Sequence, residues 1–586
     1  MANLRPTRLV VGLAAAALAI STGPALAAVA KPTAPALAAT ATMATHLRNA
    51  TSLGAAPASA PVPVTVTLTP RNPAALDALI AAQTNRASSS YHRYLTPATF
   101  AARFGATSAQ LNSVTAYLRA SGLSAVAASP NHLAVTGQAT AASAEKAFHT
   151  TLGLFDQAGR TILANTAPAL VPQSLAGLVS GVVGLNQAQS AHGFTTNTAI
   201  KHTSTNAISS TSFNPPALAT AYDATSLPAA TGTAMAILAE GDLTQVVKDL
   251  RTEEAANHLP QVPVTIVPTG ATSSDTSGVI EWDLDSQTST AMANNVKALY
   301  LYDAPSLNDP DIVNEVNAFV SQDRAPAGSA SFGECDSQAS QDGTTTAVDN
   351  ALKEASAQGQ TLFASSGDTG SSCAVASLPI IGQVPGSPET SYPASGTYTA
   401  GVGGTTLATT HGTYANESGW SGSGGGRSTE APGPWTTNAD RTVSASSSSG
   451  GGLLGVLSAL SGQNGTAPAT ASRAVPDLAM DADPSTGANI VVNGSVETVG
   501  GTSLASPLAL GAWTRINGVH GNNLGPAAPA IYGLYNSTHP SGSAGGATPG
   551  LHDVVSGSNG AYSAKPGYDL VTGLGTIDVA ALSKVI

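Results

Sequence analysis

The sequence predicts an α/β protein in which a parallel sheet flanked by helices follows a smaller α+β unit. Short apolar runs at 234–238, 330–332 and 361–364 are separated by helical stretches. Because strands buried on both faces read as short apolar runs, this alternation is typical of a parallel sheet. The chain has 586 residues, more than one compact core normally holds, so at least two domains are expected.

The N-terminal unit is expected to begin with a strand, because Val62, Val64, Val66 and Leu68 alternate with other residues. A Thr-Pro pair at 96–97 predicts the start of a helix, since proline fits the first helical turn. Further elements are expected at 73–83 (helix), before Gly122 (helix), at 132–136 (strand) and at 141–149 (helix). The unit ends near residue 185.

The first residues have the layout of an export signal. Arg5 and Arg8 precede an apolar run over 9–20, and small residues lead to Ala27. The apolar run is too short to span a bilayer comfortably, and no later stretch is long enough. We therefore expect a signal peptide over 1–27 and a mature protein that is secreted and extracellular, with no membrane partner.

Residues 187–212 have the composition of a linker, rich in Ser, Thr, Asn and His and without an apolar period. Exposed linkers are the usual sites of precursor cleavage, so we expect a processing site in this segment. It divides the rest of the chain into 28–186 and 213–586. A low-complexity stretch over 444–452 is expected to form a surface loop.

Charge and cysteine content narrow the class of protein. A net charge of −12 and a pI near 5.3 argue against a nucleic-acid partner, which would require a basic surface. The chain has two cysteines, Cys335 and Cys373. In an exported chain, an isolated pair favours one disulfide over a metal site or a nucleophile.

The sharpest local motif is Gly500-Gly501-Thr502-Ser503, with Pro507 four residues beyond it. The glycines permit a tight turn that presents the Ser503 hydroxyl, and Pro507 suits the first turn of a helix that follows. A helix N-terminus beside the hydroxyl would favour developing negative charge. The alternative is an ordinary turn rich in glycine and serine, without chemistry.

Three carboxylates are candidates for acid–base chemistry. Glu281 and Asp285 are four residues apart, so a helix would place both on one face and Asp283 on another. Close carboxylates share protons, which raises one apparent pKa and suits a base that works at acidic pH. Asp368, in Ser366-Gly367-Asp368, would donate a hydrogen bond to an oxyanion when protonated. Its alternative role is to cap a turn or a helix.

His411 offers a different base. Asp368, His411 and Ser503 occur in the order that subtilisins use. However, His411 lies in a segment with the pattern of a hairpin, and no apolar helical run follows it. A catalytic histidine needs helix geometry and an orienting partner here, so we expect the carboxylates to act instead.

Together these motifs resemble the sedolisin (serine-carboxyl peptidase) family with its kumamolisin-type activation domain. The likeness covers nearly the whole chain. It is carried by Tyr94-Leu95-Thr96-Pro97, Ala147-Phe148, Glu281 with Asp285, Ser366-Gly367-Asp368, Val402-Gly403-Gly404-Thr405, Gly424-Gly425-Gly426, Pro476-Asp477 and Gly501-Thr502-Ser503. Two positions depart from it, because many members have Ser-Gly at 500–501 and some have Trp where this chain has Phe332.

The resemblance implies a subtilisin-like catalytic domain over 213–586, preceded by an activation pro-domain over 28–186. It assigns Ser503 as nucleophile, Glu281 as general base, Asp285 as the partner of Glu281, and Asp368 as oxyanion donor. It also implies one structural Ca2+ ion, a cation that prefers oxygen ligands. The implied ligands are the side chains of Asp553 and Asp569 and the carbonyls of Val554, Lys565 and Gly567.

The resulting expectation is an acid-active endopeptidase that cleaves proteins or peptides, removes its own pro-domain and is monomeric. The pro-domain would act as an intramolecular inhibitor and chaperone. A tripeptidyl-peptidase remains open, because that specificity depends on whether one end of the cleft is closed. An inactive secreted binding protein on the same fold is the other alternative, although binding alone would not require all four catalytic residues.

Overall fold

The computed structural model describes residues 36–45, 47, 50–157, 159–188, 190–201, 212–378, 382–436, 472–539 and 546–586. Leu37–Ile586 forms one compact unit. The expected signal peptide over 1–27, the linker residues 202–211 and the expected surface loop over 444–452 lie outside the described residues, so the expectations for these segments stay predictions. Among the described helices, none combines the length and the apolar character needed to cross a membrane.

The N-terminal region contains the expected strand as β3 (Pro61–Leu68), the third member of an antiparallel sheet. The order of this sheet is β4 (Ser124–Ala128), β5 (Ala134–Thr140), β3 and β9 (Val179–Val183). Val62, Val64, Val66 and Leu68 are all buried in a core of their own, as their alternation predicts. In a smaller sheet, β6 (Leu152–Gln157) lies between β2 (Ala50–Ala55) and β7 (Arg160–Asn165), and in another β1 (Leu37–Ala39) pairs with β8 (Leu170–Pro172).

The expected N-terminal helices are present. They are α1 (Pro73–Thr84), α2 (Pro97–Phe104), α3 (Ser108–Ser121) and α4 (Ala141–Phe148). Thr96 caps α2 by accepting the amide of Thr99, which explains why the Thr-Pro pair marks its start. Gly122 ends α3 with a φ of 102°, a left-handed conformation that glycine adopts without strain.

The large sheet confirms the predicted α/β class. Its order is β13 (Val264–Pro268), β14 (Ala298–Ala304), β12 (Ala234–Glu240), β15 (Ala327–Ala330), β17 (Thr361–Ser365), β21 (Ala400–Thr410), β25 (Leu478–Asp481), β29 (Thr576–Ile577) and β28 (Leu551–His552). The neighbours from β13 to β29 are parallel. Two antiparallel partners lie outside that series, β28 beside β29 and β22 (Thr413–Gly419) beside β21.

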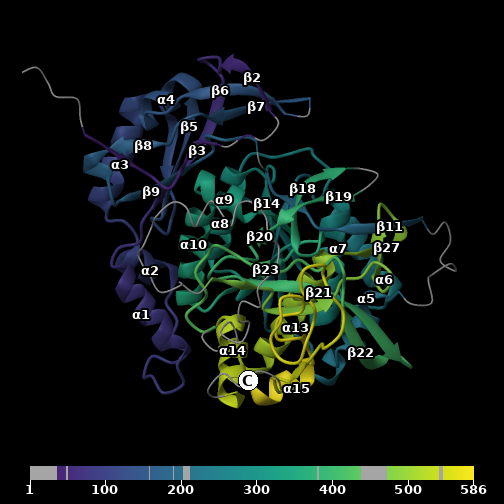
Figure 1. Ribbon diagram of the computed structural model, residues 1–586. Helices are drawn as coiled ribbons and strands as arrows, with labels where there is room; N and C mark the ends of the chain where they lie inside the picture. The colour runs from purple at the N-terminus through teal and green to yellow at the C-terminus, as the bar shows by residue number, and fades with distance from the viewer. Residues whose placement is uncertain are drawn as a thin grey trace, which may run out of the picture. The chain divides into compact units, whose positions relative to one another are not determined.

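Helices flank this sheet (Figure 1). They are α5 (Pro215–Ala221), α6 (Thr244–Ala256), α7 (Val279–Ala293), α8 (Asp309–Gln322), α9 (Asp336–Asp342), α10 (Thr344–Gln358), α13 (Thr502–Val519), α14 (Ala527–Thr538) and α15 (Val579–Val585). α7 and α13 pack closely, because a Cβ at Gly511 would lie only 2.6 Å from the carbonyl of Ser289. This close approach brings the helix of the two carboxylates beside the helix of the candidate nucleophile.

One predicted strand is wrong. The apolar run at 330–332 is not continuous, because β15 ends at Ala330 and a separate strand, β16 (Phe332–Cys335), follows Ser331. β16 leaves the parallel sheet and pairs antiparallel with β10 (His192–Gly193) and β20 (Ser391–Tyr392). Ser331 therefore lies between two sheets, with its backbone carbonyl outside both ladders.

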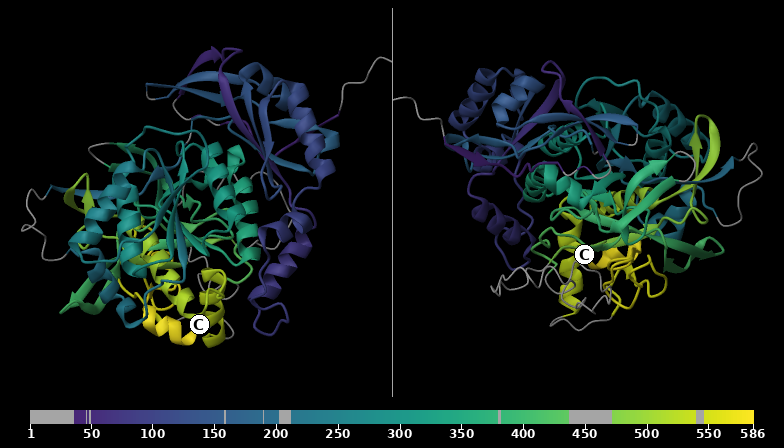
Figure 2. Two further views of the ribbon diagram at one scale, coloured as in Figure 1. Left: turned by 180° about the vertical axis from the view of Figure 1, so that it is seen from behind. Right: turned by 45° about the horizontal axis from the view of Figure 1, so that its top comes forward.

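The N-terminal region packs on the surface made by α8, α9 and α10 (Figures 1 and 2). The amide nitrogen of Asn131 donates to the Glu354 carboxylate at 2.8 Å and to the Asn317 side chain at 2.9 Å. Gln83 donates to the carbonyl of Ala357 at 3.0 Å. These polar contacts are buried, so they attach the N-terminal region to α8 and α10 by groups that water does not reach.

Candidate active site

Glu281 and Asp285 lie one turn apart on α7, and both are buried. The Ser331 hydroxyl donates to Asp285 Oδ1 at 2.7 Å, which orients that carboxyl. Asp283, between them, is near Asp249 on a different side of the helix. The i, i+4 spacing thus brings Glu281 and Asp285 together and separates Asp283, as the sequence predicts.

Burial raises the pKa of Glu281 well above its usual range, and the charge of Asp285 raises it further. Hydrogen bonds from Ser503 and Thr195 to Glu281 oppose that rise. Burial also raises the pKa of Asp285 well above normal, and the hydrogen bond from Ser331 opposes it. Burial of both groups, and the charge of Asp285 beside Glu281, therefore favour the protonated forms of these carboxyl groups.

Ser503 is the second residue of α13 and is fully buried. Its hydroxyl donates to the carbonyl oxygen of Ser331 at 3.3 Å, and Glu281 lies near enough that Ser503 lowers the pKa of the Glu281 carboxyl. Gly501, just before the helix, has a φ of 103° and so provides the turn that glycine permits.

The start of α13 corrects one expectation. The helix begins at Thr502, so Pro507 lies inside it instead of in its first turn. Because proline has no N–H, the helical hydrogen bond to the Ser503 carbonyl is not made. The departure from the family at Gly500 also has a local reason. A Cβ there would lie 2.5 Å from the Ala482 carbonyl oxygen and 2.6 Å from the Pro484 nitrogen.

Asp368 follows β17 and faces the start of α13. Its Oδ1 accepts the backbone N–H of Thr502 at 2.7 Å and the Thr502 hydroxyl at 2.9 Å. Burial raises the pKa of Asp368 to about 7, and the hydrogen bonds from Thr502 and Thr196 limit the rise. Asp368 therefore accepts a hydrogen bond at the N-terminus of α13, and its raised pKa favours the neutral form in acidic solution.

His411 lies in the turn between β21 and β22, the hairpin that its surroundings predict. It is exposed and has a φ of 53°. Glu281, and not His411, lies beside Ser503. The histidine alternative therefore has no geometric support.

The linker passes through this group of residues, a feature that the sequence analysis missed. The backbone N–H of Thr195 donates to Glu281 Oε2 at 3.0 Å, and that of Phe194 donates to the Ser331 carbonyl at 3.2 Å. The Thr196 hydroxyl hydrogen-bonds Asp368 Oδ2 at 2.7 Å. β11 (Thr196–Lys201) then pairs with β27 (Ser495–Gly500). One available signal was Phe194, the only aromatic residue in the polar segment 187–212.

Two structural expectations near the site can be compared with the structure. Cys335 and Cys373 form a disulfide with an S–S distance of 2.00 Å, as predicted. Phe332 is fully buried, and its ring packs edge-on against Trp282 with 6.5 Å between centroids. Phe332 therefore packs against Trp282 and, having no polar atom on its ring, donates no side-chain hydrogen bond.

The residues expected to bind calcium lie together at the C-terminal loops. Asp553 accepts the Gly567 N–H at 3.1 Å, and Asp569 Oδ2 accepts the Lys565 N–H at 3.0 Å. Asp569 Oδ1 accepts the N–H groups of Val571 and Thr572 at 2.8 Å. Burial raises the pKa of both aspartates, and these backbone hydrogen bonds oppose the rise. Two carboxylates thus converge on the loop at 565–567, and this oxygen donor set suits Ca2+.

A second acidic cluster was not predicted from the sequence. Asp309, Glu334 and Asp342 are buried, and one ligand oxygen from each lies within 4.8 Å of the others. In the described part of the chain, Asp309 Oδ1, Glu334 Oε2 and Asp342 Oδ2 have no hydrogen-bond partner. The cluster could hold a metal ion. It was missed because its members come from α8, β16 and α9, which the fold brings together.

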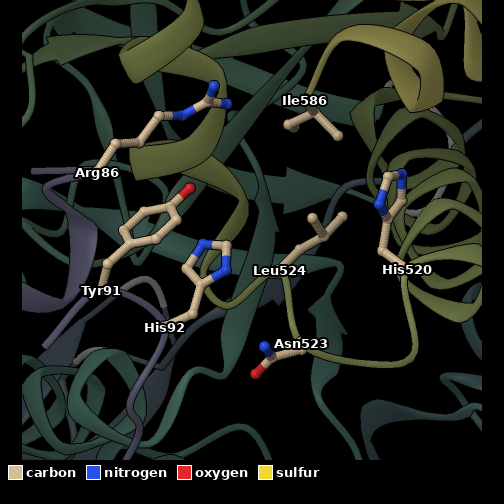
Figure 3. A pocket seen from close by; sticks show the side chains of 7 residues that line it. All are labelled: Arg86, Tyr91, His92, His520, Asn523, Leu524 and Ile586. Carbon is tan, nitrogen blue, oxygen red and sulfur yellow. The ribbon is translucent and has the colours of Figure 1, made fainter. Parts of the chain in front are cut away.

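A surface pocket lies elsewhere. It is formed where Arg86, Tyr91 and His92 of the N-terminal region face residues near the C-terminus, His520, Asn523, Leu524 and Ile586 (Figure 3). None of the candidate catalytic residues lines it. The pocket is therefore separate from the candidate catalytic residues described above.

Comparison with known proteins identifies the family. The chain is 34% identical to sedolisin from Pseudomonas sp. (strain 101) over 539 residues, which cover 89% of this chain and 86% of sedolisin. The chain belongs to the sedolisin family of serine-carboxyl peptidases. It is also 35% identical to xanthomonalisin from Xanthomonas sp. (strain T-22) over 570 residues, covering 89% of this chain and 65% of xanthomonalisin. The predicted family is thus confirmed.

Two further matches cover the two regions of this sedolisin-family chain. Residues 48–188 match the family model described as "Pro-kumamolisin, activation domain". The solved structure of Pseudomonas sedolisin, a serine-carboxyl proteinase complexed with two molecules of pseudo-iodotyrostatin, superposes with a TM-score of 0.54 at 33% identity. That match covers 64% of this chain and 97% of the sedolisin structure. An activation domain therefore precedes the sedolisin-like sheet.

Proposed function

We propose that this chain is the precursor of a secreted, acid-active serine-carboxyl endopeptidase that removes its own activation domain. Ser503 is the nucleophile, Glu281 the general base, Asp285 the partner that holds a proton with Glu281, and Asp368 the oxyanion donor. The observation that carries the proposal is the contact of 3.0 Å between Glu281 Oε2 and the backbone N–H of Thr195. A piece of this protein's own chain thus occupies the site as a peptide substrate would.

The chemistry follows from the positions of these groups. Glu281 accepts the proton of the Ser503 hydroxyl as Oγ attacks the carbonyl carbon of the bound peptide. Neutral Asp368 donates a hydrogen bond to the oxyanion, and the N-terminus of α13 favours the same charge. Glu281 then returns the proton to the departing amine, and water hydrolyses the acyl-enzyme by the reverse sequence of proton transfers.

Acidic pH suits this arrangement. The base must be ionised, while the oxyanion donor must be protonated, and both groups are buried. Because the pKa of Asp368 is raised to about 7, this group loses its proton as the pH rises through neutrality. Activity that depends on neutral Asp368 is therefore present below pH 7 and declines above it.

The path of the linker favours an endopeptidase over a tripeptidyl-peptidase. A tripeptidyl-peptidase needs a cleft that is closed beyond three residues. Here the chain continues from Thr195 in both directions, through Ala191, whose N–H donates to the Leu307 carbonyl at 3.1 Å, and through β11. A cleft that accepts a continuous chain on both sides supports cleavage within proteins.

The decisive experiment compares four variants of the acidified precursor. Ser503→Ala should abolish both self-processing and hydrolysis of an added denatured protein. Glu281→Gln and Asp285→Asn should each lower the rate by about 10²–10⁴-fold, the usual contribution of a general base. His411→Ala, an exposed turn residue, is the matched control and should remain active. Full activity of Ser503→Ala would leave only the inactive-binding-protein alternative or a contaminating peptidase.

The activation domain is proposed to be an intramolecular inhibitor. It is attached to α8 and α10 by the buried contacts of Asn131 and Gln83, and the linker that leaves it covers Glu281 and Asp368. No external substrate can reach these groups while that segment is bound. Processing within the linker would release it.

Calcium binding is a further part of the proposal. The side chains of Asp553 and Asp569 would hold the ion together with the carbonyls of Val554, Lys565 and Gly567. The ion would bridge the two loops and so stabilise the native state, because it binds only when the loops are folded. Protons compete for the same carboxylates, so the ion is held less tightly in acid.

A further inference from the structure

The linker segment 191–196, which we call the site segment, is bound as an extended strand. His192 and Gly193 pair antiparallel with Gly333 and Phe332 of β16. Three residues further on, Thr196 pairs with Gly500 of β27. Strand addition of this kind is a general way in which proteins bind extended peptides, because the backbone hydrogen bonds fix the register. The register therefore fixes the site segment relative to β16 and to β27, the strand that ends just before Ser503.

One peptide bond lies among the catalytic groups. On its N-terminal side, the Phe194 N–H and the Ser503 hydroxyl share one acceptor, the Ser331 carbonyl, at 3.2 and 3.3 Å. The Phe194 carbonyl lies over Gly501, where an added Cβ would be 2.1 Å from its oxygen and 2.5 Å from Asp368 Oδ2. On its C-terminal side is the Thr195 nitrogen, 3.0 Å from Glu281 Oε2. The carbonyl thus faces the oxyanion donor, and the nitrogen faces the proton carrier.

We propose that self-processing cleaves the bond between Phe194 and Thr195, and that the pocket holding Phe194 makes the enzyme prefer a large apolar or aromatic residue on the N-terminal side of the cleaved bond. This inference rests on the proposed function. In the reaction, Ser503 Oγ bonds to the Phe194 carbonyl carbon as the bond to the Thr195 nitrogen breaks. Glu281 carries the serine proton to that nitrogen. Water then hydrolyses the ester, which leaves a carboxylate on Phe194 and restores the serine hydroxyl.

The pocket is built around a ring. Phe194 is 1% exposed, and its ring lies between two glycines. A Cβ at Gly333 would lie 2.9 Å from ring atom Cε2, and one at Gly367 would lie 4.0 Å from Cε1. The Ser391 hydroxyl borders the same space, 3.0 Å from the Gly367 position. The absence of side chains on both glycines makes room for a flat ring, and these neighbours carry no charge that would attract a basic or acidic side chain.

The preceding position is restricted to a small residue. A Cβ on Gly193 would lie 2.3 Å from Glu281 Oε2, so a larger residue would displace the carboxylate that must exchange the proton. His192, one residue earlier, packs its ring against the edge of the Phe194 ring with 5.2 Å between centroids. The sequence Gly-Phe therefore fits this site at two adjacent positions.

The test begins with purified full-length precursor, acidified and sampled early by intact-mass measurement and N-terminal sequencing. The first new N-terminus should be Thr195. Phe194→Asp should slow this cut about 100-fold, because the pocket would bury an unpaired carboxylate. Phe194→Tyr should keep it within a few-fold of the original rate. Ile208→Asp, which adds the same charge elsewhere in the linker, is the matched control and should be cut at Thr195 at an unchanged rate.

An added peptide, Ala-His-Gly-Phe-Thr-Thr, separates this inference from the proposed function. Hydrolysis of the peptide between Phe and Thr by the matured enzyme, together with the Thr195 terminus, supports both. A Ser503-dependent cut at another linker bond that Phe194→Asp leaves unchanged would overturn the inference and keep the peptidase. If neither the precursor nor the peptide is cleaved between pH 3 and 7, both fail. Equal melting temperatures of Ser503→Ala and Ser503→Ala with Phe194→Asp would show that slowed cutting is not misfolding.

Discussion

Asp368 allows the proposed chemistry to be tested by a substitution that keeps its shape. Its Oδ1 accepts hydrogen bonds from the N–H and the hydroxyl of Thr502, at 2.7 and 2.9 Å. Asparagine at this position would therefore keep its carbonyl oxygen toward Thr502 and place its NH2 group where Oδ2 now lies. That group donates hydrogen bonds at every pH, whereas the aspartic acid donates only when protonated.

The expected magnitude follows from the raised pKa. With a pKa of about 7, Asp368 is roughly 90% protonated at pH 6 and roughly 10% protonated at pH 8. The rate of Asp368→Asn divided by that of the unaltered precursor should thus rise about tenfold between these two pH values. Titration of groups that Asp368 does not influence affects both proteins and cancels in the ratio. Asp368→Ala, which removes the donor, should be slower by about 10²–10³-fold at pH 5.

The assay is the first-order rate at which each purified precursor loses its activation domain, measured by intact mass from pH 4 to 8. Independence of the rate from protein concentration would establish that the cut is intramolecular. A ratio that stays flat from pH 6 to 8 would refute neutral Asp368 as the oxyanion donor. If the Asp368→Asn precursor is instead as slow as Asp368→Ala, donating a hydrogen bond is not enough. Asp368 would then have to transfer its proton to the oxyanion.

Two further predictions concern stability and use Ser503→Ala to prevent self-digestion. Burial raises the pKa of Asp283 to about 9 and that of Glu253 to about 8, so the folded state favours the protonated forms of both groups. The melting temperature should therefore rise as the pH falls from 8 to 5. A melting temperature that decreases steadily as the pH falls over this range would contradict these raised pKa values. Calcium at 100 times its dissociation constant should stabilise the protein by about 2.7 kcal/mol, seen as a higher melting temperature near neutral pH. Asp569→Ala should remove this response and Asp309→Asn should keep it, while the reverse result would move the ion to the buried cluster of Asp309, Glu334 and Asp342.

Local patterns in the sequence were enough to predict most elements near the site. The spacing of Glu281 and Asp285 determines that both lie on one face of a helix, whatever the rest of the chain does. Gly122 and the Thr-Pro pair at 96–97 mark helix ends through their own backbone preferences. Ser331 could not be found in this way. Its role depends on the chain passing from one sheet to another at this residue. The apolar run around Ser331 instead predicts a single continuous strand.

The composition of the linker does not predict that part of it is bound in the candidate active site. The linker is polar and shows no apolar periodicity, which is typical of an exposed, unstructured segment. On this basis the sequence predicts a processing site within 187–212. Yet a substrate bound by strand addition needs no apolar period, because β16 and β27 supply the hydrogen bonds and only one side chain must fill a pocket. In such a polar segment the informative residue is the one that is not polar. The site has room for the ring of Phe194 and for a glycine before it. The predicted processing window of 187–212 therefore narrows to the bond between Phe194 and Thr195.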